Sequence, residues 1–216
     1  MTSGIVTHFD KQENPHPLGL ASFGVTTFVF SFYNLGVCGI EHENVGLGLA
    51  LFYGGFTQFV AGMWEMHLGN TLPATLFSSY GAFWLSFGLI SLPSSGISAA
   101  YTDIKEYDYA IGIFLSSWAI FTIIMLICSQ RTNNCMISAL FLLFWVYVCL
   151  VLGKFTGQRV FTKISGGIGV VLAILSYYMT LANMLTKVNS CFTLPIGERN
   201  VGNDNTHQTI SVENKV

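Results

Sequence analysis

The chain has 216 residues, of which 52% are hydrophobic and only 9% are charged, and its formal net charge is −2. Asp, Glu, Lys and Arg make up about a quarter of a typical water-soluble domain, so this composition excludes an ordinary soluble surface and favours a lipid environment. With only 9 Lys and Arg residues in all, we also expect no nucleic-acid partner.

Six long apolar runs follow one another along the chain, and nearly all charged residues lie outside them. The runs are residues 18–40, 45–66, 72–92, 109–128, 136–152 and 164–185. Each is close to the roughly 20 residues that a helix needs to cross a hydrocarbon core of about 30 Å. The sequence therefore predicts an all-α membrane protein, with six transmembrane helices in one compact bundle and both polar termini on the same side.

Three regions are predicted: an N-terminal polar segment with a heptapeptide motif (1–17), the six-span domain (18–196) and a polar, disordered tail (197–216). Positive charge does not orient the bundle, because the Lys and Arg residues that flank the runs are balanced between the two sides. On the terminus side these are Lys11, Arg131, Lys187 and Arg199, and on the other side Lys105, Lys154, Arg159 and Lys163.

No group of residues has the pattern of a catalytic centre. The five histidines lie in tails, in loops or at span edges, away from a nucleophile that they could activate: His8, His16, His42, His67 and His207. Within the six runs the Glu-x-x-His spacing of metal sites is absent, and the cysteines form no Cys-x-x-Cys pair. We therefore expect neither an enzyme nor a metal or other cofactor.

Polar residues within the runs recur at the spacing of one helix face. In the first run Phe23, Thr27, Phe30 and Asn34 follow at i, i+4, i+7 and i+11. The second and sixth runs repeat the pattern with Gly54, Gln58, Gly62 and Glu65, and with Ser165, Gly169, Leu172, Ser176, Thr180 and Asn183. Two interpretations stay open for each face: helix packing through small and polar groups, or the lining of a narrow path. Glu65, at the end of its span, either reaches the lipid headgroups or lies on such a path.

Seven motifs occur in order between residues 14 and 198. They are Asn14-Pro15-His16-Pro17-Leu18-Gly19-Leu20, Phe23-Gly24-x-Thr26-Thr27, Phe52-Tyr53-Gly54-Gly55, Gly69-Asn70-Thr71, Ser79-Tyr80-Gly81-x-Phe83-Trp84, Trp118-x-x-Phe121-Thr122 and Leu194-Pro195-Ile196-Gly197-Glu198. In this order they resemble the motifs of the acetate uptake transporter family, which includes a bacterial succinate-acetate permease and fungal acetate and ammonia exporters. The likeness leaves only the two tails uncovered.

This resemblance implies a homo-hexamer in which each six-helix protomer has its own path for acetate or similar small monocarboxylates. It also implies a hydrophobic constriction of one Phe, one Tyr and one Leu. Matching motifs assign Phe23 and Tyr80 to it, and ungapped alignment from Trp118 to Gly153 assigns Leu143. The Tyr80 hydroxyl is then available to hydrogen-bond a carboxyl group. The candidate residues for the rest of the path are Thr27, Phe30, Asn34, Gln58, Glu65, Trp84 and Ser176.

The heptapeptide is expected to set the start of the first span, through Asn14, Pro15, Pro17, Leu18, Gly19 and Leu20. Two prolines restrict the residues before them and hold the chain extended ahead of the helix. His16 stands where relatives commonly have Ala, and it puts a titratable group at the membrane interface. Whether it senses pH is left open by the sequence.

The predicted function is a transporter or channel for acetate and similar monocarboxylates, in the plasma membrane. A bare carboxylate is costly to bury and no Lys or Arg lies at the centre of a span, so proton-coupled passage is expected. Two alternatives remain: an ammonia or ammonium exporter, and a membrane sensor or scaffold whose polar tail is the output.

Overall fold

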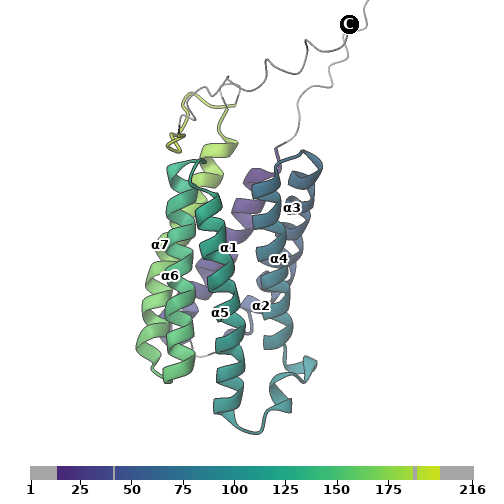
Figure 1. Cartoon of the computed structure of the whole chain (residues 1–216), viewed down its shortest axis with the longest axis vertical. Helices are drawn as coiled ribbons and strands as arrows, with labels where there is room; N and C mark the ends of the chain where they lie inside the picture. The colour runs from purple at the N-terminus through teal and green to yellow at the C-terminus, as the bar shows by residue number, and fades with distance from the viewer. Residues whose placement is uncertain (1–13, 41, 187–188, 200–216) are drawn as a thin grey trace, which may run out of the picture.

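The computed structural model describes residues 14–40, 42–186 and 189–199, and these form an almost entirely helical bundle (Figure 1). Five long α-helices run along the bundle: α1 (His16–Leu35), α4 (Thr71–Ser91), α5 (Ile104–Cys128), α6 (Asn134–Thr156) and α7 (Arg159–Met184). A further continuous helical stretch combines α2 (Gly46–Gly48), η2 (Leu49–Thr57) and α3 (Gln58–His67). Short turns η1 (Val37–Gly39), η3 (Pro93–Ser95) and η4 (Ser98–Ala100) complete the elements.

The heptapeptide forms the first turns of α1, which corrects the expectation of an extended segment ahead of the span. Pro15 caps the helix with φ −76° and ψ −11°, and Pro17 lies in the first turn. A proline is tolerated there because the N–H that it lacks has no partner in the first turn of a helix. Asn14 adds a side-chain oxygen that accepts from the His16 amide at 3.0 Å. The span therefore begins at His16, before the predicted Leu18.

The first span also ends earlier than its apolar run predicts. Gly36 has φ +71°, and its N–H donates to the carbonyls of Phe32 and Tyr33. Glycine takes this left-handed conformation without strain and commonly ends a helix. Residues 37–40 are apolar, but they form the turn η1 and its end and do not extend α1. The predicted boundary at Ile40 is wrong for this reason.

The second span contains a π-helical segment, η2, at its centre. A π-helical turn changes the rotational phase of the residues that follow it, and such turns are frequent at functional sites. With this phase Gly54, Gln58, Gly62 and Glu65 are all buried, so the predicted face does point into the bundle. A Cβ on Gly54 would lie 2.6 Å from Thr26 Oγ1, so this segment packs closely against α1.

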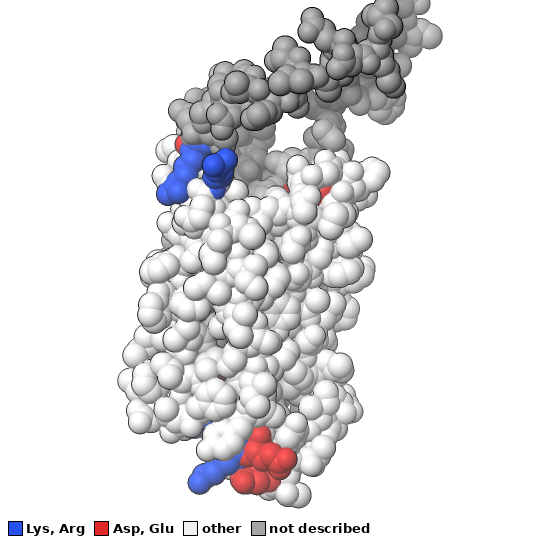
Figure 2. All heavy atoms as spheres, in the orientation of Figure 1, with Lys and Arg blue, Asp and Glu red and all other residues white. Residues whose placement is uncertain are grey.

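Five helical stretches are long and apolar enough to cross a membrane: α1, the α2–η2–α3 stretch, α5, α6 and α7. On the face that Figure 2 shows, coloured charged residues lie at the two ends of the bundle and the broad band between them is white. Many large apolar side chains are exposed, for example Phe52, Ile113 and Ile127. Such a surface is stable in lipid and not in water, so the chain is a multi-pass membrane protein.

α4 has 21 residues but is absent from this group of five. Its length is sufficient and it contains no charged residue, but serines and glycines lower its mean hydropathy. The structure thus supports five spans by length and composition, where the sequence predicts six. α4 nevertheless runs along the bundle beside α3 (Figure 1).

Residues 189–199 return to the turn between α5 and α6. The Gly197 carbonyl accepts from Asn134 N at 2.9 Å, and Arg199 Nε donates to Asn134 Oδ1 at 2.9 Å. Tyr178 of α7 donates to the Pro195 carbonyl. The motif 194–198 is therefore held against the bundle. The sequence predicts a disordered tail over residues 197–216, and residues 200–216 of it lie outside the described residues.

Replacement of Gly81 by Ala is expected to destabilise the bundle. A Cβ at Gly81 would lie 2.6 Å from Phe59 N and 2.9 Å from the Gly55 carbonyl, both backbone atoms of the second span that cannot rotate away. Overpacking of this kind costs about 1–3 kcal/mol. A control is Gly167→Ala in α7, where a Cβ meets nothing within 4 Å. Thermal melting in detergent should show a lower Tm for Gly81→Ala alone; equal melting of the two variants would contradict this packing.

Candidate functional site

Two cavities lie within the bundle and share part of their walls. The larger cavity has a volume of about 320 Å³ and is bordered mainly by α1, α4, α5 and α6, and at one end by Glu43 and by Thr162 of α7. The smaller cavity has a volume of about 40 Å³ and is bordered by α1, α3, α4, α6 and α7. Phe23 and Leu143 line both cavities. These two side chains therefore form the partition between the cavities.

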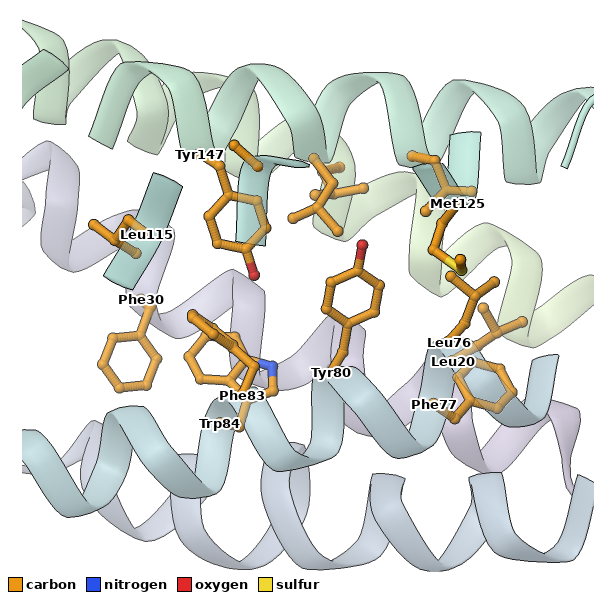
Figure 3. Close-up of a cluster of buried hydrophobic side chains, with 14 of the residues drawn as sticks. Leu20, Phe30, Leu76, Phe77, Tyr80, Phe83, Trp84, Leu115, Met125 and Tyr147 are labelled. Carbon is orange, nitrogen blue, oxygen red and sulfur yellow. The ribbon is translucent and has the colours of Figure 1, made fainter. Parts of the chain in front are cut away.

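Tyr80 borders the smaller cavity beside this partition. Its ring centroid lies 6.1 Å from that of Phe23, and only 3% of the residue is exposed. Figure 3 shows Tyr80 reaching into the interior from α4 and Tyr147 reaching in from the opposite ribbon. The three residues assigned to the constriction thus come together from α1, α4 and α6. Their role in selecting solutes stays a prediction.

The Tyr80 hydroxyl is already engaged within the protein. It lies 2.9 Å from Thr122 Oγ1, and Thr122 donates its own proton to the Trp118 carbonyl at 2.7 Å. Because Thr122 has one proton to give, Tyr80 is left as the donor to Thr122. In this arrangement Tyr80 presents a ring and not a free donor to a solute. This differs from the hydrogen-bonding role that the sequence suggests for it.

Three buried polar atoms have no hydrogen-bond partner among the described residues: Thr27 Oγ1, Trp84 Nε1 and Gln58 Oε1. Thr27 and Trp84 line the larger cavity, and Gln58 lines the smaller one. A buried polar atom without a partner costs about 1–3 kcal/mol. These groups therefore have unused hydrogen-bonding capacity beside the cavities; the indole N–H and the hydroxyl are donors, and the amide oxygen is an acceptor.

Two other predicted residues lie on the larger cavity. Phe30 borders it and packs on Trp84, with ring centroids 5.1 Å apart. Asn34 lies one turn further along α1 and also borders a third, outer cavity. Together with Phe23 and Thr27 they form the face of α1 that the helical spacing predicts. The whole of this face thus lines the cavity.

Ser176 and Glu65 make protein contacts that the spacing does not predict. The Ser176 hydroxyl borders the smaller cavity but donates to the Leu20 carbonyl at 3.0 Å, so it joins α7 to α1. Glu65 is 1% exposed and is not among the residues that line the larger, smaller or outer cavity. The assignment of Glu65 to the path stays a prediction.

Glu65 instead joins the ends of three helices. Its Oε1 lies 3.0 Å from His16 Nδ1, and its Oε2 accepts from Asn70 Nδ2 at 2.6 Å. The His16 ring also packs on Phe77, with centroids 5.1 Å apart. The first turn of α1, the last turn of α3 and the N-cap of α4 therefore share one buried carboxylate. His16 has a structural partner that its position in the sequence does not reveal.

Among the remaining heptapeptide residues, Gly19 packs closely against α4. A Cβ on Gly19 would lie 2.5 Å from the Phe77 ring, so only glycine allows this approach. Leu20 is buried and lines the smaller cavity, whereas Leu18 is 44% exposed. The motif thus combines a helix start, a close contact and one cavity wall.

Sequence reasoning missed several lining residues. Phe83 and Tyr147 border the larger cavity, with ring centroids 5.5 Å apart. Tyr147 stands four residues after Leu143, so helical spacing from Leu143 is a signal that could have found it. Glu43 and Lys154 also border this cavity, at the end where it meets the outer cavity. Nothing in their local sequence relates them to each other.

Known proteins resemble this chain along most of its length. The model of the GPR1/FUN34/yaaH family matches residues 2–198. Acetate permease A of Emericella nidulans is 39% identical over 201 residues, covering 86% of this chain and 66% of that protein. Ammonia transport outward protein 2 of Saccharomyces cerevisiae is 40% identical over 196 residues, covering 88% of this chain and 69% of that protein.

Bacterial relatives match over nearly their whole length. The succinate-acetate/proton symporter SatP of Escherichia coli is 31% identical over 189 residues, covering 87% of this chain and 97% of that protein. Among solved structures, the bacterial acetate channel SatP superposes with a TM-score of 0.77 at 29% identity, covering 87% of this chain and all of that one. The chain thus spans about two thirds of the two fungal proteins and almost all of the bacterial one.

Proposed function

Because this chain belongs to the GPR1/FUN34/yaaH family, we propose that it is a membrane transporter or channel for acetate and similar small monocarboxylates. The observation that carries the proposal is the pair of cavities that meet at Phe23 and Leu143. Relatives named acetate permease, succinate-acetate/proton symporter and acetate channel support the same solute class. The relatives carry solutes, and we propose no catalytic activity for this chain.

The chemistry of the cavity walls fits a short carboxylic acid. Phe23, Leu143 and Tyr80 offer apolar surface to a methyl group, and Thr27 and Trp84 offer donors to the carboxyl oxygens. Such a division between apolar walls and a few polar groups is usual in small-molecule sites. We propose Phe23, Tyr80 and Leu143 as the constriction and the two donors as contacts on one side of it.

A proton accompanies the solute in this proposal. The described lining of the smaller cavity carries no charged side chain, and that of the larger cavity carries only Glu43 and Lys154 at its outer end. An isolated carboxylate costs several kcal/mol or more to transfer into such surroundings, whereas the neutral acid does not carry this cost. Passage as the acid, or together with a proton, is therefore physically favoured.

We also propose that α4 completes a sixth span. Its inward face is buried against the rest of the bundle, with Phe77, Tyr80 and Trp84 among its covered residues. A helix that is largely enclosed by protein needs less hydropathy to lie in a membrane than one that faces lipid. Six spans put both termini on the same side. The homo-hexamer and the plasma membrane location that the family resemblance implies belong to the same proposal.

Ammonia export is the second candidate function. It is favoured by the 40% identity to a protein named Ammonia transport outward protein 2. An aromatic, largely uncharged passage also suits a small neutral molecule such as ammonia. The two candidates differ in the solute that saturates transport, so one assay with both solutes separates them.

The test is solute uptake into liposomes that contain the purified protein. Under an inward pH gradient, labelled acetate is expected to enter at least about ten times faster than in protein-free liposomes. The rate of uptake should also saturate with acetate concentration, because a confined passage limits the rate. Labelled methylammonium should not saturate or compete. No acetate uptake above the protein-free level would overturn the proposed function, and saturable methylammonium uptake alone would favour ammonia export.

A matched pair of variants tests whether the path runs through the partition. Leu143→Trp puts a larger ring at the wall shared by the two cavities, whereas Phe141→Trp changes the exposed face of the same helix. Acetate flux should fall at least about tenfold only in Leu143→Trp, since overfilling a packed wall leaves no room for a solute. Equal flux in the two variants would remove Leu143 from the path.

A further inference from the structure

An outer cavity opens at the end of the bundle where α6 ends and α7 begins. Its volume is about 450 Å³. Four residues line both this outer cavity and the 320 Å³ cavity, which is called the larger of the two within the bundle: Asn34, Glu43, Lys154 and Thr162. We call the outer cavity the mouth cavity and define it by those four residues together with Asp108, Arg159 and Lys163, which also line it. The shared residues make the mouth cavity continuous with the candidate path.

The walls of the mouth cavity differ in charge from those of the path. Three cations, Lys154, Arg159 and Lys163, face two carboxylates, Glu43 and Asp108. When all five groups are ionised, the cavity therefore has an excess of one positive charge. A net positive charge at an opening raises the local concentration of anions. This excess favours anions at the end of an otherwise nearly uncharged passage.

Lys154 is the cation that reaches the path itself. It donates to Asp108 Oδ1 at 2.7 Å, and the two side chains are 38% and 31% exposed. Ion pairs with this much contact with water contribute only about 0–1 kcal/mol, so a competing carboxylate can replace one partner at little cost. Lys154 also borders the larger cavity, whereas Asp108 does not.

Glu43 modulates the charge beside Lys154. Burial raises the pKa of the Glu43 carboxyl, and the ammonium of Lys154 offsets part of that rise. The charged groups around it are Asp108 from α5, Lys154 from α6, and Arg159 and Lys163 from α7, and His42 lies beside it on its own loop. A raised pKa means that Glu43 takes up a proton before an ordinary carboxyl does as the pH falls. The excess positive charge then increases.

We propose that the mouth cavity is a recruiting site for small carboxylate anions, in which Lys154 exchanges Asp108 for the carboxylate of the arriving solute. The proposal rests on the proposed function, because it assigns the outer end of the same path. It names a binding step that precedes passage of the partition at Phe23 and Leu143. Asp108 holds the ammonium of Lys154 in place until the anion arrives.

Two variants with opposite expected effects test the exchange. Lys154→Gln removes the cation, so the half-saturating concentration of acetate in the liposome assay should rise about fivefold to tenfold at low salt. Asp108→Asn frees Lys154 from its competitor, so this concentration should fall about twofold to fivefold. The control is Lys105→Gln, which removes an exposed charge near the start of α5 that does not line the mouth cavity. It should stay within about twofold of the unmodified protein.

Opposite signs separate a recruiting site from a structural ion pair. If Lys154→Gln and Asp108→Asn both raise the half-saturating concentration and lower the Tm alike, the pair is structural and the proposal is overturned. The NMR line broadening of labelled acetate with the detergent-purified protein gives a readout without transport. Suppose that the unmodified protein moves no acetate but binds it, and that binding falls in Lys154→Gln alone. This result would overturn the proposed function and support the recruiting site. If instead Lys154→Gln binds and transports acetate like the unmodified protein, the recruiting site is overturned and the proposed function stands.

Glu43→Gln tests the pH dependence of the same site. In the unmodified protein the half-saturating concentration, expressed as acetate anion, should fall as the pH is lowered towards the raised pKa of Glu43, because Glu43 loses its charge in that direction. In Glu43→Gln it should be low throughout, since the neutral amide mimics the protonated carboxyl. A pH dependence that persists unchanged in Glu43→Gln would exclude Glu43 as the modulating group.

Discussion

Replacing Phe23 by Ala is expected to broaden the range of solutes that cross the bundle. Phe23 lies on the wall shared by the two cavities, with its ring 6.1 Å from that of Tyr80. Loss of the ring is expected to join the smaller and larger cavities, because it removes part of the apolar wall between them. One methylene in an apolar pocket already discriminates by about 10–200-fold, so loss of a whole ring is expected to raise the benzoate-to-acetate flux ratio at least about tenfold.

The measurement is uptake of labelled benzoate and labelled acetate into the same preparation of liposomes. The ratio of the two fluxes corrects for differences in the amount of protein inserted. Phe141→Ala is the matched control, because it removes the same ring from the exposed face of α6 and away from both cavities. A ratio that rises equally in the two variants, or in neither, would exclude Phe23 as the selecting residue.

Replacing Glu65 by Ala is expected to destabilise the protein more than Gly81→Ala does. The carboxylate is 1% exposed and holds both His16 and Asn70, which belong to different helix ends. The change removes two hydrogen bonds to a carboxylate, each of which contributes about 1.5–3 kcal/mol, so the total loss is about 3–6 kcal/mol. For a chain of this size the loss corresponds to a fall in Tm of about 6–24 °C.

Melting of the detergent-purified variants provides the measurement. Glu106→Ala is the control, since Glu106 is an exposed carboxylate in the first turn of α5 and should melt like the unmodified protein. His16→Ala should lie between the two, because Asn70 still donates to the carboxylate when the imidazole is gone. If Glu65→Ala melts no earlier than Glu106→Ala while acetate transport is lost, Glu65 acts on the solute and not on the fold.

The sequence predicts well those features that depend on neighbours within one helix. The length of an apolar run determines whether a helix can cross a membrane, and five of the six predicted spans correspond to helical stretches with sufficient hydropathy. The face of α1 with Phe23, Thr27, Phe30 and Asn34 is also predicted, because helical periodicity depends only on the backbone geometry. Each of these four side chains lines the larger cavity.

Helix ends are predicted less well, because short local signals override hydropathy. The apolar run 18–40 gives no sign that Gly36 ends α1 by adopting a left-handed conformation. The two prolines before Leu18 look like helix breakers, although the first turn of a helix accepts them. The π-helical segment η2 also escapes any prediction that assumes one constant helical period.

By itself, the sequence determined that this is a helical membrane protein and which family its motifs resemble. It also determined which face of the first helix carries the polar and aromatic residues. Tertiary structure alone decided what each polar group does. Glu65 contacts His16, which is 49 residues away along the chain. Ser176 donates to Leu20 over a separation of 156 residues, and Lys154 donates to Asp108 over 46 residues. The physical reason is that periodicity is a property of one helix, whereas the partner of a buried polar group depends on how separate helices pack. The same packing brings Phe23 of α1 and Leu143 of α6 to one wall.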